Sequence, residues 1–277
     1  MEQQVPFYQI DAFASAPFKG NQACIMPLED GFLPDATLQA IAAENNVAET
    51  AYLVADGEGA WQLRWFTPAV EVPLCGHATL AAAHVLFDEL AYAGEAITFR
   101  TRQSGDLIVR RGETGYVMDF PAPEVFPIEV GDEIASALGA QPIAAWGGPF
   151  YAAQFESPEA VRALKPDLRA LATLGVSGIG GNWDRGNFGC FALGGEGVEV
   201  TSRFFAPGSG IDEDPATGSW HCMLTAIATG LLGQETISCY QAYPSRGAAL
   251  TCTARGNRVD LCGAAVTVIR GTFTLPA

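Results

Sequence analysis

Two polar side chains in the first half of this sequence have the types and surroundings that proton transfer needs. Glu49 stands between a helical segment and a run of Tyr, Leu and Val, so we expect a partly desolvated carboxylate that can act as a general base or acid. His77 follows Gly76 at an expected helix start, where the positive helix end favours a neutral imidazole. The simpler alternatives are a solvated loop carboxylate for Glu49 and a capping or packing role for His77.

Two further candidates lie in the second half. Asp214 belongs to the acidic run 212–214, which could equally cap the helix that follows. Ser219 is most simply a cap residue, but it occupies the position that His77 occupies in the first half. This equivalence predicts that Ser219 faces the same ligand as His77.

The equivalence comes from a motif that occurs twice. Residues 64–68 (RWFTP) precede 71–78 (EVPLCGHA), and residues 203–207 (RFFAP) precede 213–220 (EDPATGSW), with three extra residues in the second copy. Each copy predicts an aromatic strand, a turn limited by proline, and a helix that starts at Gly76 or Gly218. Because a helix start offers unpaired N–H groups, the two copies indicate one small anionic ligand held between two halves.

The residue before each glycine differs between the copies. Cys75 in the first copy aligns with Thr217 in the second. A racemase with two thiols needs one on each face of the substrate carbon, and a threonine hydroxyl is far too weak an acid to replace a thiolate. Two-sided thiol chemistry is therefore disfavoured, and Cys75 is expected to be a small packing residue.

Composition limits the partners. The net charge of −16, with only 15 basic residues scattered along 277, argues against nucleic acid. No apolar run approaches the ~20 residues of a membrane span, and no signal peptide is recognisable. The seven cysteines lack a C-x-x-C pair, so we expect free thiols in a cytoplasmic protein. Three histidines do not favour a metal cluster, so we expect no metal site, and no nucleotide-binding motif is present.

The order of expected strands and helices favours an α+β chain of two similar halves. Strands outnumber helices, and each half is expected to curl a mostly antiparallel sheet around one main helix. Residues 34–45 have helical spacing, with Leu38, Ile41 and Ala42 on one face. The glycine-rich segment 175–187 is expected as a loop, and residues 264–270 and 271–275 as closing strands. The proline cluster at 121–123 marks the boundary. The expected domains are residues 1–120, completed by a C-terminal strand at about 264–277, and residues 121–263, with the active cleft between them.

Taken together, these motifs resemble the PhzF family, phenazine-biosynthesis-like isomerases related in fold to diaminopimelate epimerase. The resemblance covers nearly the whole chain. It rests on the segments 11–13 (DAF), 18–21 (FKGN), 46–50 (NVAET), 64–68, 71–79, 213–219, and Gln241 with 245–247 (SRG). Departures are Gln22 where many members have proline, and Ala48 where serine is usual.

The resemblance implies a cofactor-free isomerase, commonly a homodimer, acting on a small carboxylate-bearing substrate. By motif, Glu49 would be the acid/base group, and His77, Asp214 and Ser219 would surround the substrate and steer the proton. Gly76 and Gly218, with Asn21 and Thr217, would bind the substrate. The alternatives are a racemase or epimerase that depends on Cys75, and a small-ligand binding protein without catalysis.

Overall fold

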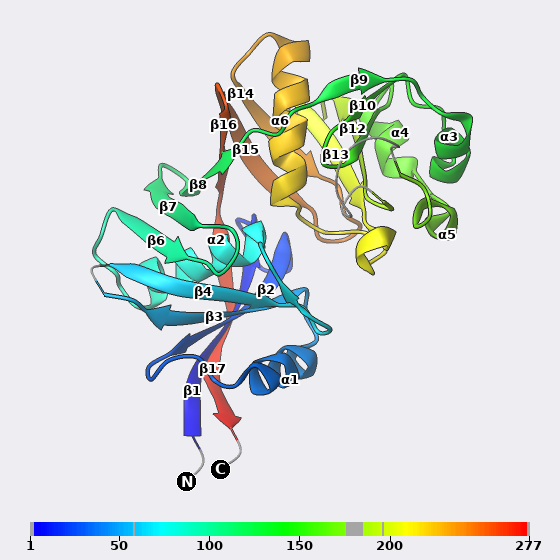
Figure 1. Ribbon diagram of the computed structural model, residues 1–277. Coiled ribbons are helices and arrows are strands. Elements are labelled where there is room, and N and C mark those ends of the chain that lie inside the picture. The colour runs from blue at the N-terminus through cyan, green and yellow to red at the C-terminus, as the bar shows by residue number, and fades with distance from the viewer. Residues whose placement is uncertain (1–2, 58, 176–184, 196, 276–277) are drawn as a thin grey trace. The chain divides into compact units, whose positions relative to one another are not determined.

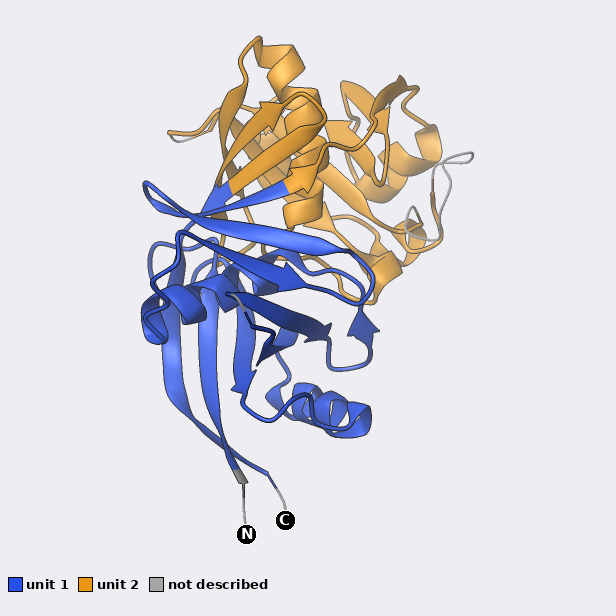
Figure 2. Ribbon diagram, turned by 60° about the vertical axis from the view of Figure 1, so that its left-hand side comes forward, with its two compact units in different colours: residues 1–119, 262–277 blue, residues 120–261 orange. Residues whose placement is uncertain are grey.

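The computed structural model describes residues 3–57, 59–175, 185–195 and 197–275. These residues divide into two compact units, residues 1–119 with 262–277 (unit 1) and residues 120–261 (unit 2) (Figure 2). The chain passes into unit 2 within strand β8 and returns within strand β16. The boundaries expected from the sequence were residues 120 and 263.

Unit 1 is a mixed sheet packed on a central helix. Its strands are β1 (Gln3–Ala12), β2 (Asn21–Leu28), β3 (Glu49–Ala55), β4 (Ala60–Phe66), β5 (Glu71–Val72), β6 (Ala96–Arg100), β7 (Asp106–Gly112), β8 (Gly115–Pro121) and β17 (Ala265–Leu275). Helix α2 (Gly76–His84) packs against β1, β2, β3 and β17 and continues into a π-helical turn, η1 (Val85–Glu89) (Figure 1). The C-terminal strand β17 pairs antiparallel with β1 and so completes this sheet.

Helix α1 (Asp35–Asn45) closes a second small core in unit 1. Its buried face presents Leu38, Ile41 and Ala42 to the side chains of Tyr52 and Phe66. The helical spacing of these three residues predicted that face correctly. Parallel pairing places the start of β2 beside the start of β3, with Ala23 opposite Glu49.

Unit 2 repeats the plan. Its strands are β9 (Phe126–Ile128), β10 (Ala144–Gly147), β11 (Tyr151–Gln154), β12 (Phe188–Leu193), β13 (Val200–Phe205), β14 (Thr236–Gln241), β15 (Ala248–Arg255) and β16 (Arg258–Gly263). Its helices are α3 (Asp132–Leu138), α4 (Pro158–Ala163), α5 (Leu168–Leu171), the 3-10 turn η2 (Pro207–Ser209) and α6 (Gly218–Leu232). Helix α6 packs against β12, β14 and β15 (Figure 1).

The pairing of the central strands is the same in both units. In unit 1, β2 and β3 are parallel, β3 and β4 antiparallel, and β4 and β6 parallel. Unit 2 shows the same directions. Its strands β11 and β12 are parallel, β12 and β13 antiparallel, and β13 and β14 parallel. The expected α+β class, with a sheet around one central helix in each half, is confirmed.

Some local predictions were wrong or lie outside the described residues. The C-terminal segment, expected as two strands broken at Gly271, is the single strand β17. The glycine-rich loop expected over residues 175–187 falls mostly outside the described residues. No helix in the described parts of the chain is long and apolar enough to cross a membrane.

Candidate active site

Both copies of the repeated motif end in the same helix start. The residue before each helix, Cys75 or Thr217, is extended, with φ −146° and ψ 110° in the first and φ −114° and ψ 101° in the second. Helices α2 and α6 then begin at Gly76 and Gly218, as the sequence predicted. The first N–H groups of a helix have no partner inside it, so each start can receive an anion.

In unit 1 the helix start gathers four side chains with acid, base or amide groups. Nε2 of His77 lies 2.9 Å from Oε2 of Glu49, and Nδ1 of His77 lies 3.5 Å from Sγ of Cys75. The side-chain amide of Asn21 lies 3.2 Å from the same Nδ1. His77, Cys75 and Asn21 are buried, and the Glu49 side chain is 17% exposed. The structure therefore brings together three predicted site residues, and Cys75 is more than packing because its thiol contacts His77.

Glu49 keeps one carboxylate oxygen available for a proton. Its Oε2 atom is at ion-pair distance from His77, but among the described residues no donor meets it with hydrogen-bond geometry. A buried acceptor without a directed donor is uncommon, because an unpaired polar atom costs free energy. Such an oxygen is suited to accept a proton from a substrate that enters the site.

The expected neutral state of His77 is not what this setting favours. Burial alone would lower the pKa of His77, but the acidic groups of Cys75 and Glu49 raise it well above its ordinary value. Burial, then the charge of Glu49, also raises the pKa of the Cys75 thiol, so the thiol is protonated at neutral pH. We therefore assign the raised pKa of His77 mainly to Glu49, whose nearby carboxylate outweighs the helix dipole.

The loop before Asn21 is tightly fixed. The buried carboxylate of Asp11 accepts a hydrogen bond of 2.6 Å from the N–H of Phe18. Gly20 has φ +61°, and a Cβ atom there would lie 2.0 Å from the carbonyl oxygen of Ala12. Only glycine fits such a position. The chain is thus turned so that Asn21 starts β2 beside the start of α2, where it contacts His77.

In unit 2 the helix start carries a hydrogen-bonded network. The hydroxyl of Thr217 donates to Oδ2 of Asp214 at 2.6 Å, and the N–H of Thr217 donates to Oε1 of Gln241 at 2.9 Å. Nε2 of Gln241 lies 2.5 Å from the carbonyl oxygen of Asp214 and 3.1 Å from the Thr217 hydroxyl. Gln241 is fully buried and joins Asp214 to the helix start. In the sequence, Gln241 appeared only as part of the resemblance to the PhzF family, and nothing there predicted this role.

Ser219 stands apart from this network. It is the second residue of α6 and is exposed, and its side chain has no hydrogen bond to a residue in the described ranges. The capping role expected as its simplest explanation is wrong, because Thr217 holds the cap position. An exposed hydroxyl on the first turn remains available to a ligand.

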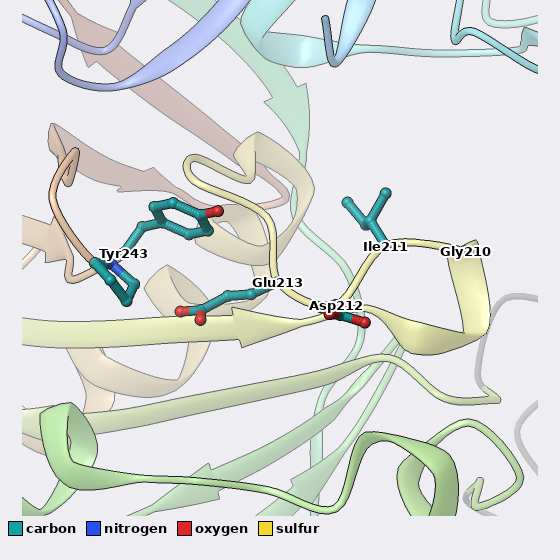
Figure 3. A pocket seen from close by; sticks show the side chains of 6 residues that line it. Gly210, Ile211, Asp212, Glu213 and Tyr243 are labelled. Atoms are coloured by element: carbon teal, nitrogen blue, oxygen red, sulfur yellow. The ribbon is translucent and has the colours of Figure 1, made fainter. Parts of the chain in front are cut away.

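Next to Asp214, unit 2 has an open pocket with a volume of about 560 Å³. Residues 210–213 form one wall, and Tyr243 with Pro244 forms another. Figure 3 shows Ile211 and Tyr243 on either side of Glu213. Both walls are continuous in sequence with the hydrogen-bonded network of unit 2. Asp214 directly follows residues 210–213, and Gln241 lies two residues before Tyr243.

Strand register identifies the unit 2 counterpart of Glu49. Thr50 pairs with Phe66 in unit 1, and Phe188 pairs with Phe205 in unit 2. Because Phe66 and Phe205 hold the same place in the repeat, the residue before Phe188 corresponds to Glu49. That residue is Asn187, which is buried and accepts a hydrogen bond of 3.0 Å from the Ser209 hydroxyl. The Glu49 carboxylate of unit 1 therefore corresponds to an amide in unit 2.

Ligand atoms suitable for a metal ion also meet in unit 1. One atom each from Glu49, Cys75 and His77 lie within 4.8 Å of one another. The expectation of no metal site considered the histidines together, whereas this group is mixed and includes only one histidine. These three residue types are common zinc ligands.

Comparisons with known proteins agree with this architecture. The family model described as "Phenazine biosynthesis-like protein" matches residues 10–271. An uncharacterized isomerase of Pseudomonas aeruginosa is 44% identical over 275 residues, covering 98% of this chain and 99% of that protein. One of Halalkalibacterium halodurans is 35% identical over 279 residues, covering 98% of each chain.

A solved structure gives the same result. The crystal structure of a PhzF family protein from Enterococcus faecalis superposes with a TM-score of 0.91 at 39% identity, covering 99% of this chain and 100% of that one. The expected resemblance is confirmed over the length of the chain, and so is the enzyme class that the relatives share. The protein is an isomerase that belongs to the PhzF family of phenazine biosynthesis-like proteins.

Proposed function

We propose that this isomerase moves a proton from one carbon atom to another of a small carboxylate-bearing substrate, with Glu49 as the acid/base group and no cofactor. The observation that carries the proposal is the Glu49 carboxylate, which lies 2.9 Å from His77 and retains a buried oxygen without a directed donor. In the forward step a C–H bond of the substrate breaks and an O–H bond forms on Glu49. The electron pair moves into the substrate, and Glu49 then returns the proton to a different carbon.

His77 supports this step through charge. Its raised pKa makes it an imidazolium at neutral pH, which places a positive ring next to the Glu49 carboxylate. The same ring can stabilise negative charge on the substrate as the proton leaves. Nδ1 of the charged ring donates a hydrogen bond, and the side-chain amide of Asn21 holds the ring in place once its oxygen is turned toward that nitrogen to accept it.

The substrate carboxylate is assigned to backbone N–H groups. Gly76 and Gly218 begin the two helices, and glycine leaves their N–H groups open to close approach. Thr217, Asp214 and Ser219 supply hydroxyl and carboxylate groups at the second helix start. We propose further that the protein works as a homodimer in the cytoplasm.

Solvent exchange tests the role of Glu49 while the substrate is still unidentified. Small cyclic or amino-acid-like carboxylates are first screened by thermal shift, because a ligand of the folded state raises the melting temperature. Each ligand found is then incubated with the enzyme in D₂O, and loss of its C–H signal is followed by NMR. We expect Glu49→Gln to slow exchange by about 10²–10⁴-fold, the usual worth of positioned acid/base catalysis.

Glu44→Gln is the matched control, since Glu44 is exposed on α1 and close in sequence. It should exchange at the wild-type rate. Wild-type exchange in the Glu49→Gln protein would refute the role of Glu49. A tight ligand that never exchanges, even with wild-type protein, would favour a binding protein without catalysis.

A second candidate, a racemase or epimerase that depends on Cys75, is favoured by the 3.5 Å contact between the Cys75 thiol and His77. Against it stand the raised pKa of this thiol and the threonine at the aligned position in unit 2. The two candidates separate in one comparison. Loss of exchange in Cys75→Ser, with exchange retained in Glu49→Gln, would favour the thiol mechanism.

A further inference from the structure

The acid/base cluster of unit 1 has the composition of a site for a soft divalent cation. Glu49, Cys75 and His77 offer a carboxylate oxygen, a thiol sulfur and an imidazole nitrogen, all within 4.8 Å of one another. Zinc binds these three donors at about 2.0–2.3 Å and accepts three protein ligands with a fourth position open. A thiol and an imidazole in the set select zinc or cobalt over magnesium or calcium, which prefer oxygen.

The distances place the ion at Nε2 of His77. This atom lies 2.9 Å from Oε2 of Glu49 and 4.0 Å from Sγ of Cys75. Donor atoms around a tetrahedral zinc ion are about 3.3–3.6 Å apart, given the bond lengths above. The carboxylate must therefore move outward by a few tenths of an ångström, and the Glu49 side chain, at 17% exposed, has room for this shift. The thiol now lies closer to Nδ1, at 3.5 Å, than to Nε2, so the Cys75 side chain must turn toward the Nε2 side by about 1 Å or more to reach the same ion.

Asn21 completes the surroundings of such a site. A neutral imidazole that binds a metal through Nε2 carries its proton on Nδ1, and a partner for that proton orients the ring. The side-chain amide of Asn21 lies 3.2 Å from Nδ1 and presents its oxygen there after a half-turn of the amide plane. Metal-binding histidines usually have a partner of this kind.

Unit 2 lacks the corresponding ligands. The positions that align with Glu49, Cys75 and His77 are occupied by Asn187, Thr217 and Ser219. An amide and two hydroxyls are poor zinc ligands. The feature therefore belongs to the first copy alone and is not a general property of the repeated helix start.

We propose that Glu49, Cys75 and His77 form a reversible site for a thiophilic divalent cation such as Zn²⁺, and that the bound ion blocks the acid/base groups of the enzyme. Coordination breaks the S–H bond of Cys75 and releases that proton to solvent, together with the extra proton of a charged His77 ring. The ion then occupies the Glu49 oxygen that would accept a proton from the substrate. Inhibition rests on the proposed function, whereas metal binding itself does not.

Cobalt is the probe, because its spectrum reports its ligands. Co²⁺ is titrated into the purified protein, and absorbance is read in the near ultraviolet, where thiolate–cobalt charge transfer appears, and in the visible. We expect both bands to saturate at one ion per chain and to disappear when Zn²⁺ is added. Cys75→Ser should lose the charge-transfer band, and Glu49→Gln should weaken Co²⁺ binding by about tenfold or more.

Other cysteines supply the controls. Cys239 and Cys252 in unit 2 hydrogen-bond each other through their thiols and are the chief rival site for a soft ion. Cys239→Ser and Cys262→Ser should keep the full charge-transfer band. A band that survives Cys75→Ser and vanishes in Cys239→Ser would overturn the proposal, as would the lack of any band in the wild-type protein.

A measurement on wild-type protein covers the case in which a variant fails to fold. Iodoacetamide labelling is quantified at each cysteine by peptide mass spectrometry, with and without Zn²⁺. Zn²⁺ should protect Cys75 and leave Cys262 unchanged, and equal labelling of Cys75 under both conditions would contradict the site. Reversal of Zn²⁺ inhibition by a chelator tests the second half of the proposal, and its failure would leave the cobalt result standing on its own.

Discussion

The loops that lead to the two helix starts use the same ion pair in different surroundings. Arg64 donates to Glu71 through Nε and Nη2 at 2.8 and 2.7 Å, and Arg203 donates to Glu213 through the same atoms at the same distances. Both arginines are buried. A two-point contact between guanidinium and carboxylate fixes the loop rigidly, which explains why the helix start has one geometry in both units.

The third contact of each arginine differs. Nη1 of Arg64 reaches Asp35, the first residue of α1, whose side chain is 68% exposed. Nη1 of Arg203 instead reaches the backbone carbonyl oxygens at the end of α4, with the shortest contact of 2.8 Å to Leu164. The two units thus share the way they hold a helix start and differ in what surrounds it.

The residues that line the helix starts have diverged further. Unit 1 has the Glu49 carboxylate and the Cys75 thiol around the His77 imidazole, whereas unit 2 joins the Asp214 carboxylate and the Thr217 hydroxyl to the Gln241 amide. The two units therefore share a helix start whose backbone N–H groups can bind an anion, and they differ in the side chains that surround it. Matched substitutions in the two units test whether this difference in side chains has measurable effects.

Removal of the two arginines should give the largest difference in stability. Arg203→Ala leaves Glu213, whose side chain is 11% exposed, without its partner. Breaking a buried pair on one side costs about 3–5 kcal/mol. Arg64→Ala should cost at least about 1 kcal/mol less, because Glu71 is 26% exposed and can be hydrated. Urea unfolding of both variants measures the difference, and equal losses would show that the surroundings of the pair do not matter.

The two histidines near the helix starts should respond to pH in opposite directions. Burial lowers the pKa of His221 to about 4 in the folded protein, despite a 2.8 Å hydrogen bond to the Thr217 carbonyl. Since an unfolded histidine has a pKa of about 6.5, the stability from neutral His221 is present above that pH. It is lost as pH falls toward 4, by about 3 kcal/mol.

The pKa of His77 is raised, so its contribution has the opposite sign. It is fully present below pH 6.5 and is lost as pH rises through the folded pKa. NMR titration of the imidazoles checks both directions. His221→Thr, which imports the residue of the aligned position Thr79, should flatten the acid side of the stability profile. Glu49→Gln should lower the pKa of His77, and an unchanged His77 titration would mean that Glu49 is not the cause.

The sequence was sufficient to predict features that depend on local chemistry. Helix starts at Gly76 and Gly218 were predicted correctly because an extended residue, a proline-limited turn and a glycine act within a few positions. The apolar face of α1 followed from helical spacing. The contact of Glu49 with His77 was implied only by family resemblance, since 28 residues and two strands separate them.

What the sequence could not show depends on register and burial. Asn187 was identified as the counterpart of Glu49 only through strand pairing, because the chains around the two residues have no common motif. The charge state of His77 was predicted wrongly, since a helix dipole can be inferred from sequence, but a carboxylate at 2.9 Å cannot. The grouping of Glu49, Cys75 and His77 could not be predicted for the same reason, because the three residues are close only in three dimensions.

The smallest expected change in stability concerns Gln241. Its side-chain amide hydrogen-bonds the start of α6, and the aligned residue of unit 1 is not an amide. Gln241→Ala leaves the Thr217 N–H and the Asp214 carbonyl without this partner, and an unsatisfied buried group costs about 1–3 kcal/mol. Strand register aligns Gln241 with Thr101, whose hydroxyl donates to the local Gly105 carbonyl and accepts from the N–H of Ser104, its two partners among the residues that the structure describes. Thr101→Ala should therefore cost less than about 1 kcal/mol.

Thermal unfolding measures the loss of stability in both variants, and hydrogen exchange at the Thr217 N–H should accelerate only in the Gln241 variant. Equal destabilisation, with that N–H still protected, would mean that the helix start keeps its geometry without Gln241 and that the two units are more alike than their side chains indicate.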